Sequence, residues 1–181
     1  MSAPAEQWTV HGSRNLYTSP WVGLDLVTVR PPGHDAYDHH VVRLPAAVGV
    51  VLHDPDRGVL LLHRHRFITD TSGYEIPAGG VEAGESVEAA AAREAHEETG
   101  WRTGPVSRLL TCNASDGATD QRFHLVHARA TEYTGPPADA YEASSLSWVP
   151  ATEIPGLIRQ GLVPGTLSTV ALLFALQFNF I

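Results

Sequence analysis

Three glutamates, Glu94, Glu97 and Glu98, are spaced so that a helix would place their carboxylates on one face, at positions i, i+3 and i+4. They would also lie near the C-terminal end of that helix, where the helix dipole disfavours anions by about 0.3–1 kcal/mol per group. A divalent cation would relieve this repulsion, and hard cations such as Mg²⁺ prefer carboxylate oxygens. The spacing therefore indicates a metal site, with a solvated acidic surface as the alternative.

The segment before this helix favours the metal site. Residues 75–80 read Glu-Ile-Pro-Ala-Gly-Gly, which combines a rigid proline with two glycines. Such a loop can bring a backbone carbonyl close to the carboxylates as a further oxygen ligand.

The helix itself is expected over residues 86–99, because alanines at 89–92 and 95 stand among glutamates there, a composition that favours helix. Ser86 can cap its start, Glu88 suits the first turn, and Gly100 suits the position after its end. The remaining pattern mixes strands and helices without a regular βαβ alternation, which predicts an α+β fold with a mixed sheet between helices. Strands are expected at 23–30, 39–44, 46–53, 58–63, 106–112, 121–130 and 146–149, and further helices at 150–160 and 167–178.

At this point a family resemblance becomes visible. Gly79, Glu85 and residues 93–101, which read Arg-Glu-Ala-His-Glu-Glu-Thr-Gly-Trp, resemble the Nudix box in residue type and spacing. Trp101 stands where the family usually has an aliphatic residue. The chain is thereby identified as a member of the Nudix hydrolase family, which implies an α/β/α sandwich with a mixed β-sheet, here with an N-terminal β-strand extension.

The resemblance also implies a role for each matched position. Glu94 and Glu98 would be the main metal ligands, Glu97 a further ligand or the catalytic base, and the carbonyl of Ala78 an additional ligand. The cofactor would be Mg²⁺, with Mn²⁺ as a substitute.

Arg93 completes the set of catalytic positions that the resemblance implies. It would form an ion pair with Glu85 that holds the loop against the helix. Because the removal of one partner of a buried pair leaves an unpaired charge, the pair would be structurally important.

Outside the box, the chain resembles the ADP-ribose pyrophosphatase branch of the family. Arg64 and Arg66 end a predicted strand, and an arginine pair at such a place can bind a diphosphate or stack on a base; ordinary surface charge is the alternative. Glu75 would bind a ribose or purine edge, or only brace the loop.

The chain departs from this branch at residues 115–121. Relatives often show Ser-Pro-Gly, followed four residues later by a glutamate that acts on the catalytic water or on a metal. Here Asp116 replaces the proline and Gln121 the glutamate, and an amide cannot accept that proton. Asp120 is adjacent and is predicted as a catalytic residue in its place, although neighbours on a strand point to opposite faces, and Glu97 is the other candidate for the base. Gln121 is placed in substrate binding.

The function expected from these features is Mg²⁺-dependent cleavage of the diphosphate bond in a nucleoside diphosphate linked to another moiety, such as ADP-ribose or a related sugar nucleotide. Two alternatives stay open within the enzyme class: hydrolysis of nucleoside triphosphates and hydrolysis of another diphosphate metabolite. A non-catalytic Nudix module that senses a nucleotide is the alternative from another class.

The composition of the chain excludes some classes of binding partner and metal site. The net charge is −8, which argues against nucleic-acid binding because that requires a basic surface. Cys112 is the only cysteine, so neither an internal disulfide nor a cysteine-based zinc site is expected. His63 and His65 would share a strand face, but none of the ten histidines has zinc-like spacing to a third ligand.

No signal peptide and no membrane span is evident, so a cytoplasmic protein is expected.

Two regions are predicted along the chain: a β extension over residues 1–45 and the Nudix domain over residues 46–181. In the ADP-ribose branch the N-terminal region exchanges between subunits, so the resemblance predicts a homodimer. Trp8, Trp21 and the apolar C-terminal helix are candidates for the interface, with packing in the core as the alternative.

Overall fold

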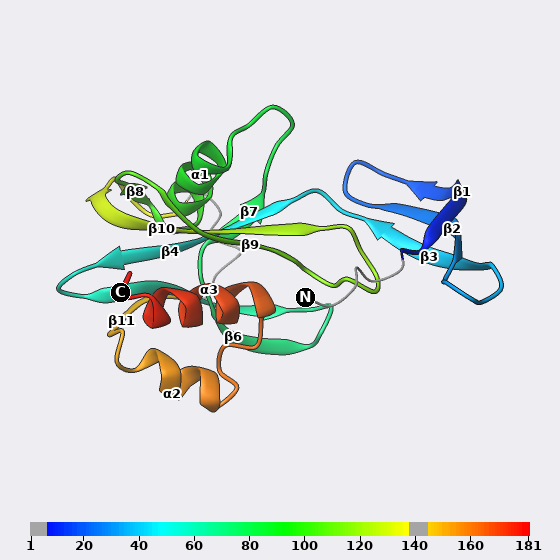
Figure 1. Ribbon diagram of the computed structural model, residues 1–181. Coiled ribbons are helices and arrows are strands. Elements are labelled where there is room, and N and C mark those ends of the chain that lie inside the picture. Colours follow the sequence, from blue (N-terminus) through cyan, green and yellow to red (C-terminus); the bar gives the residue numbers. More distant parts are fainter. Residues whose placement is uncertain (1–6, 138–144) are drawn as a thin grey trace. The chain divides into compact units, whose positions relative to one another are not determined.

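The computed structural model describes residues 7–137 and 145–181, and Figure 1 shows its elements. Contacts divide the chain into two compact units. The first contains the described residues up to Pro45 and the segment Asn113–Gln121; the second contains the described residues of Ala46–Cys112 and Arg122–Ile181. The units differ from the two predicted regions in the segment Asn113–Gln121, which the sequence had assigned to the second region.

The first unit is built on a three-stranded antiparallel sheet in the order β1-β2-β3. Its strands are β1 (Thr9–Thr18), β2 (Gly23–Arg30) and β3 (Tyr37–Arg43). The bounds of β2 are those predicted, and Pro31 directly after its last residue marks its end. β1 was missed: all of its residues are exposed, so its sequence carries no buried face that would reveal a period.

The segment Asn113–Gln121 lies along β3. Val42 forms a parallel bridge with Thr119, and its N–H donates to the carbonyl of Ala118 at 2.9 Å. Backbone pairing thus joins a segment far along the chain to the N-terminal sheet.

The second unit is built on an eight-stranded mixed sheet. Its main path is β11-β5-β4-β10-β8, while β6, β7 and β9 pair with β5, β4 and β10, respectively. The strands are β4 (Ala47–Asp54), β5 (Gly58–Arg66), β6 (Thr71–Glu75), β7 (Ala78–Gly80), β8 (Trp101–Thr103), β9 (Ser107–Asn113), β10 (Arg122–Tyr133) and β11 (Ser145–Val149). β4 and β5 form the predicted hairpin, whereas β4 and β10 run parallel.

Helices cover both faces of this sheet (Figure 1). They are α1 (Val87–Thr99), α2 (Ile154–Arg159) and α3 (Thr166–Gln177). Val48, Val50 and Leu52 of β4 pack in a core with alanines of α1, and Val51 belongs to the core formed with α2 and α3. The alternation of β4 side chains between two cores makes this unit an α/β/α sandwich, which confirms the predicted fold.

The ends of α1 follow the local signals in the sequence. The Ser86 hydroxyl accepts a hydrogen bond from the N–H of Ala89 at 3.1 Å, as an N-cap does. Gly100 ends the helix in the left-handed conformation with φ 73°, which favours glycine. The carboxylate-bearing helix is therefore fixed in length by its own sequence.

Elements set by long-range contacts were predicted less well. The short strands β6, β7 and β8 were not expected, and α2 covers six residues where the sequence predicted residues 150–160. Across residues 7–137 and 145–181, no helix has both the length and the apolar character needed to cross a membrane.

Candidate active site

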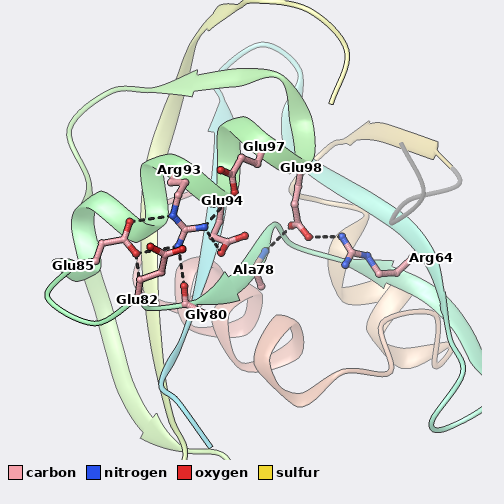
Figure 2. A network of polar contacts seen from close by, with 9 residues as sticks. All are labelled: Arg64, Ala78, Gly80, Glu82, Glu85, Arg93, Glu94, Glu97 and Glu98. Atoms are coloured by element: carbon pink, nitrogen blue, oxygen red, sulfur yellow. Dashed lines mark hydrogen bonds and ion pairs between the residues drawn. The ribbon is translucent and has the colours of Figure 1, made fainter. Parts of the chain in front are cut away.

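Arg93 organises the carboxylates of α1 (Figure 2). Its guanidinium donates to Glu85 at 2.9 and 3.0 Å, to Glu94 at 2.7 Å and to Glu97 at 3.2 Å. A further bond of 2.9 Å reaches the carbonyl of Gly80, at the end of β7. Arg93 lowers the pKa of the Glu85 carboxyl group, and the Glu85 hydrogen bonds raise the pKa of Arg93. The predicted ion pair between Arg93 and Glu85 is present, and it joins the loop, β7 and the helix.

Glu98 lies in a different setting from the other two box glutamates. Its Oε1 accepts a hydrogen bond from Arg64 Nη2 at 2.7 Å, and its Oε2 accepts one from the N–H of Ala78 at 2.8 Å. Arg64 and Glu98 are only 5% and 6% exposed. Arg64, near the end of β5, is therefore not an ordinary surface charge. Surface charge was one of the two interpretations that the sequence left open.

Arg66 and Glu75 form the next pair along the same strands. Arg66 donates two hydrogen bonds to the Glu75 carboxylate, at 2.9 and 2.6 Å. Arg64 Nε lies 3.8 Å from the same carboxylate. Glu75 thus braces the ends of β5 and β6 in this structure, while the Arg66 side chain remains half exposed.

Gly79 provides the space that Glu94 occupies. A Cβ atom built on Gly79 would overlap the carboxylate group of Glu94. A Cβ atom on the neighbouring Gly80 would meet no atom within 4 Å. A glycine at position 79 therefore leaves the Glu94 carboxylate the place that a side chain would otherwise take.

The chemistry of this group fits a divalent cation. Two guanidinium groups, of Arg64 and Arg93, contact four carboxylates, so negative charge is in excess among these partners. The donors are hard oxygens, as Mg²⁺ prefers. In the described part of the chain, however, no three His, Cys, Asp or Glu side chains are arranged to hold a metal ion together. Glu94 and Glu97 contact Arg93 in this conformation, so cation binding would require these contacts to loosen.

Exposure separates the three glutamates of the box. The Glu97 side chain is 44% exposed, whereas those of Glu94 and Glu98 are 12% and 6% exposed. A group that exchanges protons with water must reach it, while a ligand must be held in place. The arrangement therefore combines two buried carboxylates with one that is accessible to solvent.

Asp120 and Gln121, predicted from the resemblance, lie in the first unit. The Asp120 carboxylate pairs with Arg43 Nη1 at 2.9 Å, and Gln121 Nε2 donates to the carbonyl of Pro45 at 3.0 Å. Asp120 also lines a cavity of about 220 Å³ in that unit, together with His39, Val41, Asp116, Gly117, Ala118 and Thr119. Both side chains thus have structural contacts to residues 43–45.

Trp101, the departure from the usual box, has partners that the sequence did not indicate. The Arg57 guanidinium lies over the rings of Trp101 and Trp148, 4.5 and 4.6 Å from their centroids. The two tryptophan rings meet edge to face at 5.6 Å. This stack anchors the strand after α1 and gives the bulky ring a structural role. No local pattern could have revealed it, because the three residues come from distant parts of the chain.

The close approach of Gly79 to Glu94 leads to a prediction. In Gly79→Ala the new methyl group displaces the end of the flexible Glu94 side chain. The fold should survive, while the Glu94 carboxylate, a predicted metal ligand, moves. We expect Mn²⁺ affinity, measured by titration calorimetry, to fall at least about tenfold, with little change in melting temperature. Gly80→Ala is the matched control and should bind Mn²⁺ as the wild type does. Equal affinity of both variants would contradict this role of Gly79.

Comparisons with known proteins agree with the family resemblance. The family model of the NUDIX domain matches residues 43–167. A CMP-5'-(N-acetyl-N-hydroxy-3-aminopropyl)phosphonate hydrolase from Streptomyces rubellomurinus is 34% identical over 94% of this chain and 82% of its own length. The ADP-ribose pyrophosphatase of Bacillus subtilis is 27% identical over 61% of this chain, a match that spans 60% of that protein.

A solved structure described as an ADP compounds hydrolase supports the fold. It superposes with a TM-score of 0.84 over 98% of this chain and 96% of its own, at 18% sequence identity. The box, the α/β/α sandwich and the family model agree with one another, and the chain belongs to the Nudix hydrolase family.

Proposed function

We propose that this enzyme is a Mg²⁺-dependent pyrophosphohydrolase that cleaves the diphosphate bond of a nucleoside diphosphate linked to another moiety. ADP-ribose or a related sugar nucleotide is the proposed substrate class. The observation that carries the proposal is the set of Glu94, Glu97 and Glu98 on one face of α1, held against the loop of Ala78 by Arg93 and Arg64. A nucleotide sensor without activity would not need all three carboxylates.

The reaction adds one water molecule across a P–O–P bond. The hydroxyl goes to the attacked phosphorus, the bridging oxygen leaves with the other phosphorus, and one proton of the water is released. A divalent cation, when bound, neutralises charge on the phosphate oxygens and so lowers the barrier. In this proposal Glu94, Glu98 and the carbonyl of Ala78 hold the cation.

In this proposal, side chains of the protein accept the proton, position the loop and contact the substrate. Glu97, the most exposed of the three, takes the proton from the attacking water. Arg93 positions the loop through Glu85 and Gly80. Arg66, half exposed at the end of β5, contacts the diphosphate, for which a guanidinium fork is well suited.

A second candidate substrate comes from the Streptomyces relative. That protein is named for a CMP-linked phosphonate, and its match covers nearly all of this chain. The bond between CMP and a phosphonate joins two phosphorus atoms, so the same carboxylates could serve. Nucleoside triphosphates remain a third possibility within the same chemistry.

A substrate panel tests the proposal. The purified protein is incubated with ADP-ribose, sugar nucleotides, dinucleotides, a CMP-linked phosphonate and nucleoside triphosphates, each with Mg²⁺. We expect a nucleoside monophosphate and one further phosphorus-containing product from at least one of the first four, identified by mass spectrometry. EDTA should abolish the reaction, and added Mg²⁺ or Mn²⁺ should restore it.

Two results would redirect this conclusion. If pyrophosphate release from triphosphates is the main reaction, the substrate class is wrong and the chemistry stands. If no compound is hydrolysed while one of them still binds, the protein is a nucleotide sensor.

The identity of the base gives a separate prediction. Glu97→Gln should lower kcat about 10²–10⁴-fold, because an amide cannot accept the proton. Asp120→Asn should change kcat only a few-fold, because this proposal gives Asp120 a structural contact to Arg43 and no part in the proton transfer. Asp120 is the alternative base, and the opposite ranking of the two variants, with both folded, would assign the role to it.

We also propose that the protein is a homodimer formed through its first unit. The three-stranded sheet there exposes several large apolar side chains: Trp8, Val10, Leu16, Tyr17 and Tyr37, with Trp21 in the turn before β2. A sheet of this size needs a covered apolar face for stability, which a second copy would supply.

Sedimentation velocity tests the dimer. At micromolar concentration the wild type should sediment as a dimer, and Trp21→Arg should weaken association at least about tenfold. Phe67→Arg is the control, because it removes an equally exposed aromatic ring from the second unit. A monomeric wild type would rule out the dimer.

A further inference from the structure

We infer that Arg64 is a positioning residue that fixes the carboxylate of Glu98 for binding of the divalent cation. The inference rests on the proposed function, because it assigns a task within the same metal site. Its basis is the pair of bonds that Figure 2 shows on Glu98: Arg64 Nη2 to Oε1 at 2.7 Å and Ala78 N–H to Oε2 at 2.8 Å. One donor on each oxygen fixes both the place and the plane of the carboxylate.

Burial makes this arrangement rigid. Both side chains are almost fully buried, so water screens their attraction little, and either charge alone would be costly at this place. A carboxylate oxygen accepts more than one bond, so these two donors are compatible with a cation as a further partner. Groups that orient a ligand in this way commonly change metal affinity 10- to 100-fold when they are removed.

The neighbouring charges support different roles for Arg64 and Arg66. Arg66 chelates Glu75 with two hydrogen bonds, and Glu75 lies 3.8 Å from Arg64, which in turn contacts Glu98. Charges therefore alternate from the ends of β5 and β6 to α1. Arg64 is the member of this row that contacts the helix, whereas Arg66 is half exposed and suited to meet a ligand from solvent. The sequence had placed both arginines in substrate binding.

The experiment compares two variants with the same change of charge on the same strand. Mn²⁺ is titrated into Arg64→Met and Arg66→Met without substrate, and bound Mn²⁺ is followed by electron paramagnetic resonance. We expect roughly 10- to 100-fold weaker binding in Arg64→Met and a change of less than about threefold in Arg66→Met. The spectrum of the Mn²⁺ that still binds should also change in Arg64→Met, since the orientation of one ligand is lost.

Two further variants keep the test decisive if Arg64→Met is unstable, because that substitution leaves the buried Glu98 charge without its guanidinium. Arg64→Gln keeps an N–H donor on a neutral side chain and should bind Mn²⁺ with intermediate affinity. In the double variant Arg64→Met/Glu98→Gln the buried charge is absent, so Mn²⁺ affinity should equal that of Glu98→Gln alone.

The outcomes separate this inference from the proposed function. If wild-type protein binds Mn²⁺ and the Arg64 variants bind it equally well, Arg64 has no part in positioning and the inference fails alone. If Arg64→Met weakens binding by the same factor in the Glu98→Gln background, Arg64 acts by some route other than Glu98, which also overturns it. If the wild type binds no divalent cation, the proposed function fails and the inference fails with it.

Discussion

The concentration of negative charge beside one helix is the constraint on which the rest of the site depends. Glu94, Glu97 and Glu98 repel one another and lie toward the negative end of the α1 dipole. Cations fixed beside such a group offset the repulsion, and here they are Arg93 within the helix and Arg64 from β5. Each guanidinium also ties the helix to a different neighbour, so one electrostatic requirement determines how helix, loop and sheet meet.

The two arginines satisfy that requirement in different ways. Arg93 is partly exposed and shares its donors among three carboxylates and a backbone carbonyl, an arrangement that can loosen when another cation arrives. Arg64 is buried, donates to Glu98 at 2.7 Å and lies 3.8 Å from Glu75, so its contacts are costly to break. We therefore expect the contacts of Arg93 with Glu94 and Glu97 to loosen when a cation binds, while the contact of Arg64 with Glu98 persists.

Local signals were sufficient for the parts of the structure that local interactions determine. Ser86 and Gly100 mark the ends of α1 because a hydroxyl cap and a left-handed glycine act on their own neighbours. The strand β7, with the sequence Ala-Gly-Gly, carries no β preference and exists because it pairs with residues 47–49 of β4. Arg64 was predicted in substrate binding from its place at the end of a strand, with surface charge as the alternative, but its burial against Glu98 depends on two residues that are 34 positions apart.

The contacts of the segment Asn113–Gln121 also could not be predicted from local sequence. The replacement of a glutamate by Gln121 raised the question of where the catalytic base lies, and adjacency in sequence made Asp120 the natural substitute. The backbone pairing of Thr119 with Val42 and the ion pair of Asp120 with Arg43 were invisible to that reasoning, because both partners lie in the N-terminal strands. The Glu97 carboxylate lies on α1 with Glu94 and Glu98, beside the proposed cation site, whereas the Asp120 carboxylate pairs with Arg43 in the first unit. We therefore propose that Glu97, rather than the neighbouring aspartate, takes the role of the glutamate that is missing at position 121.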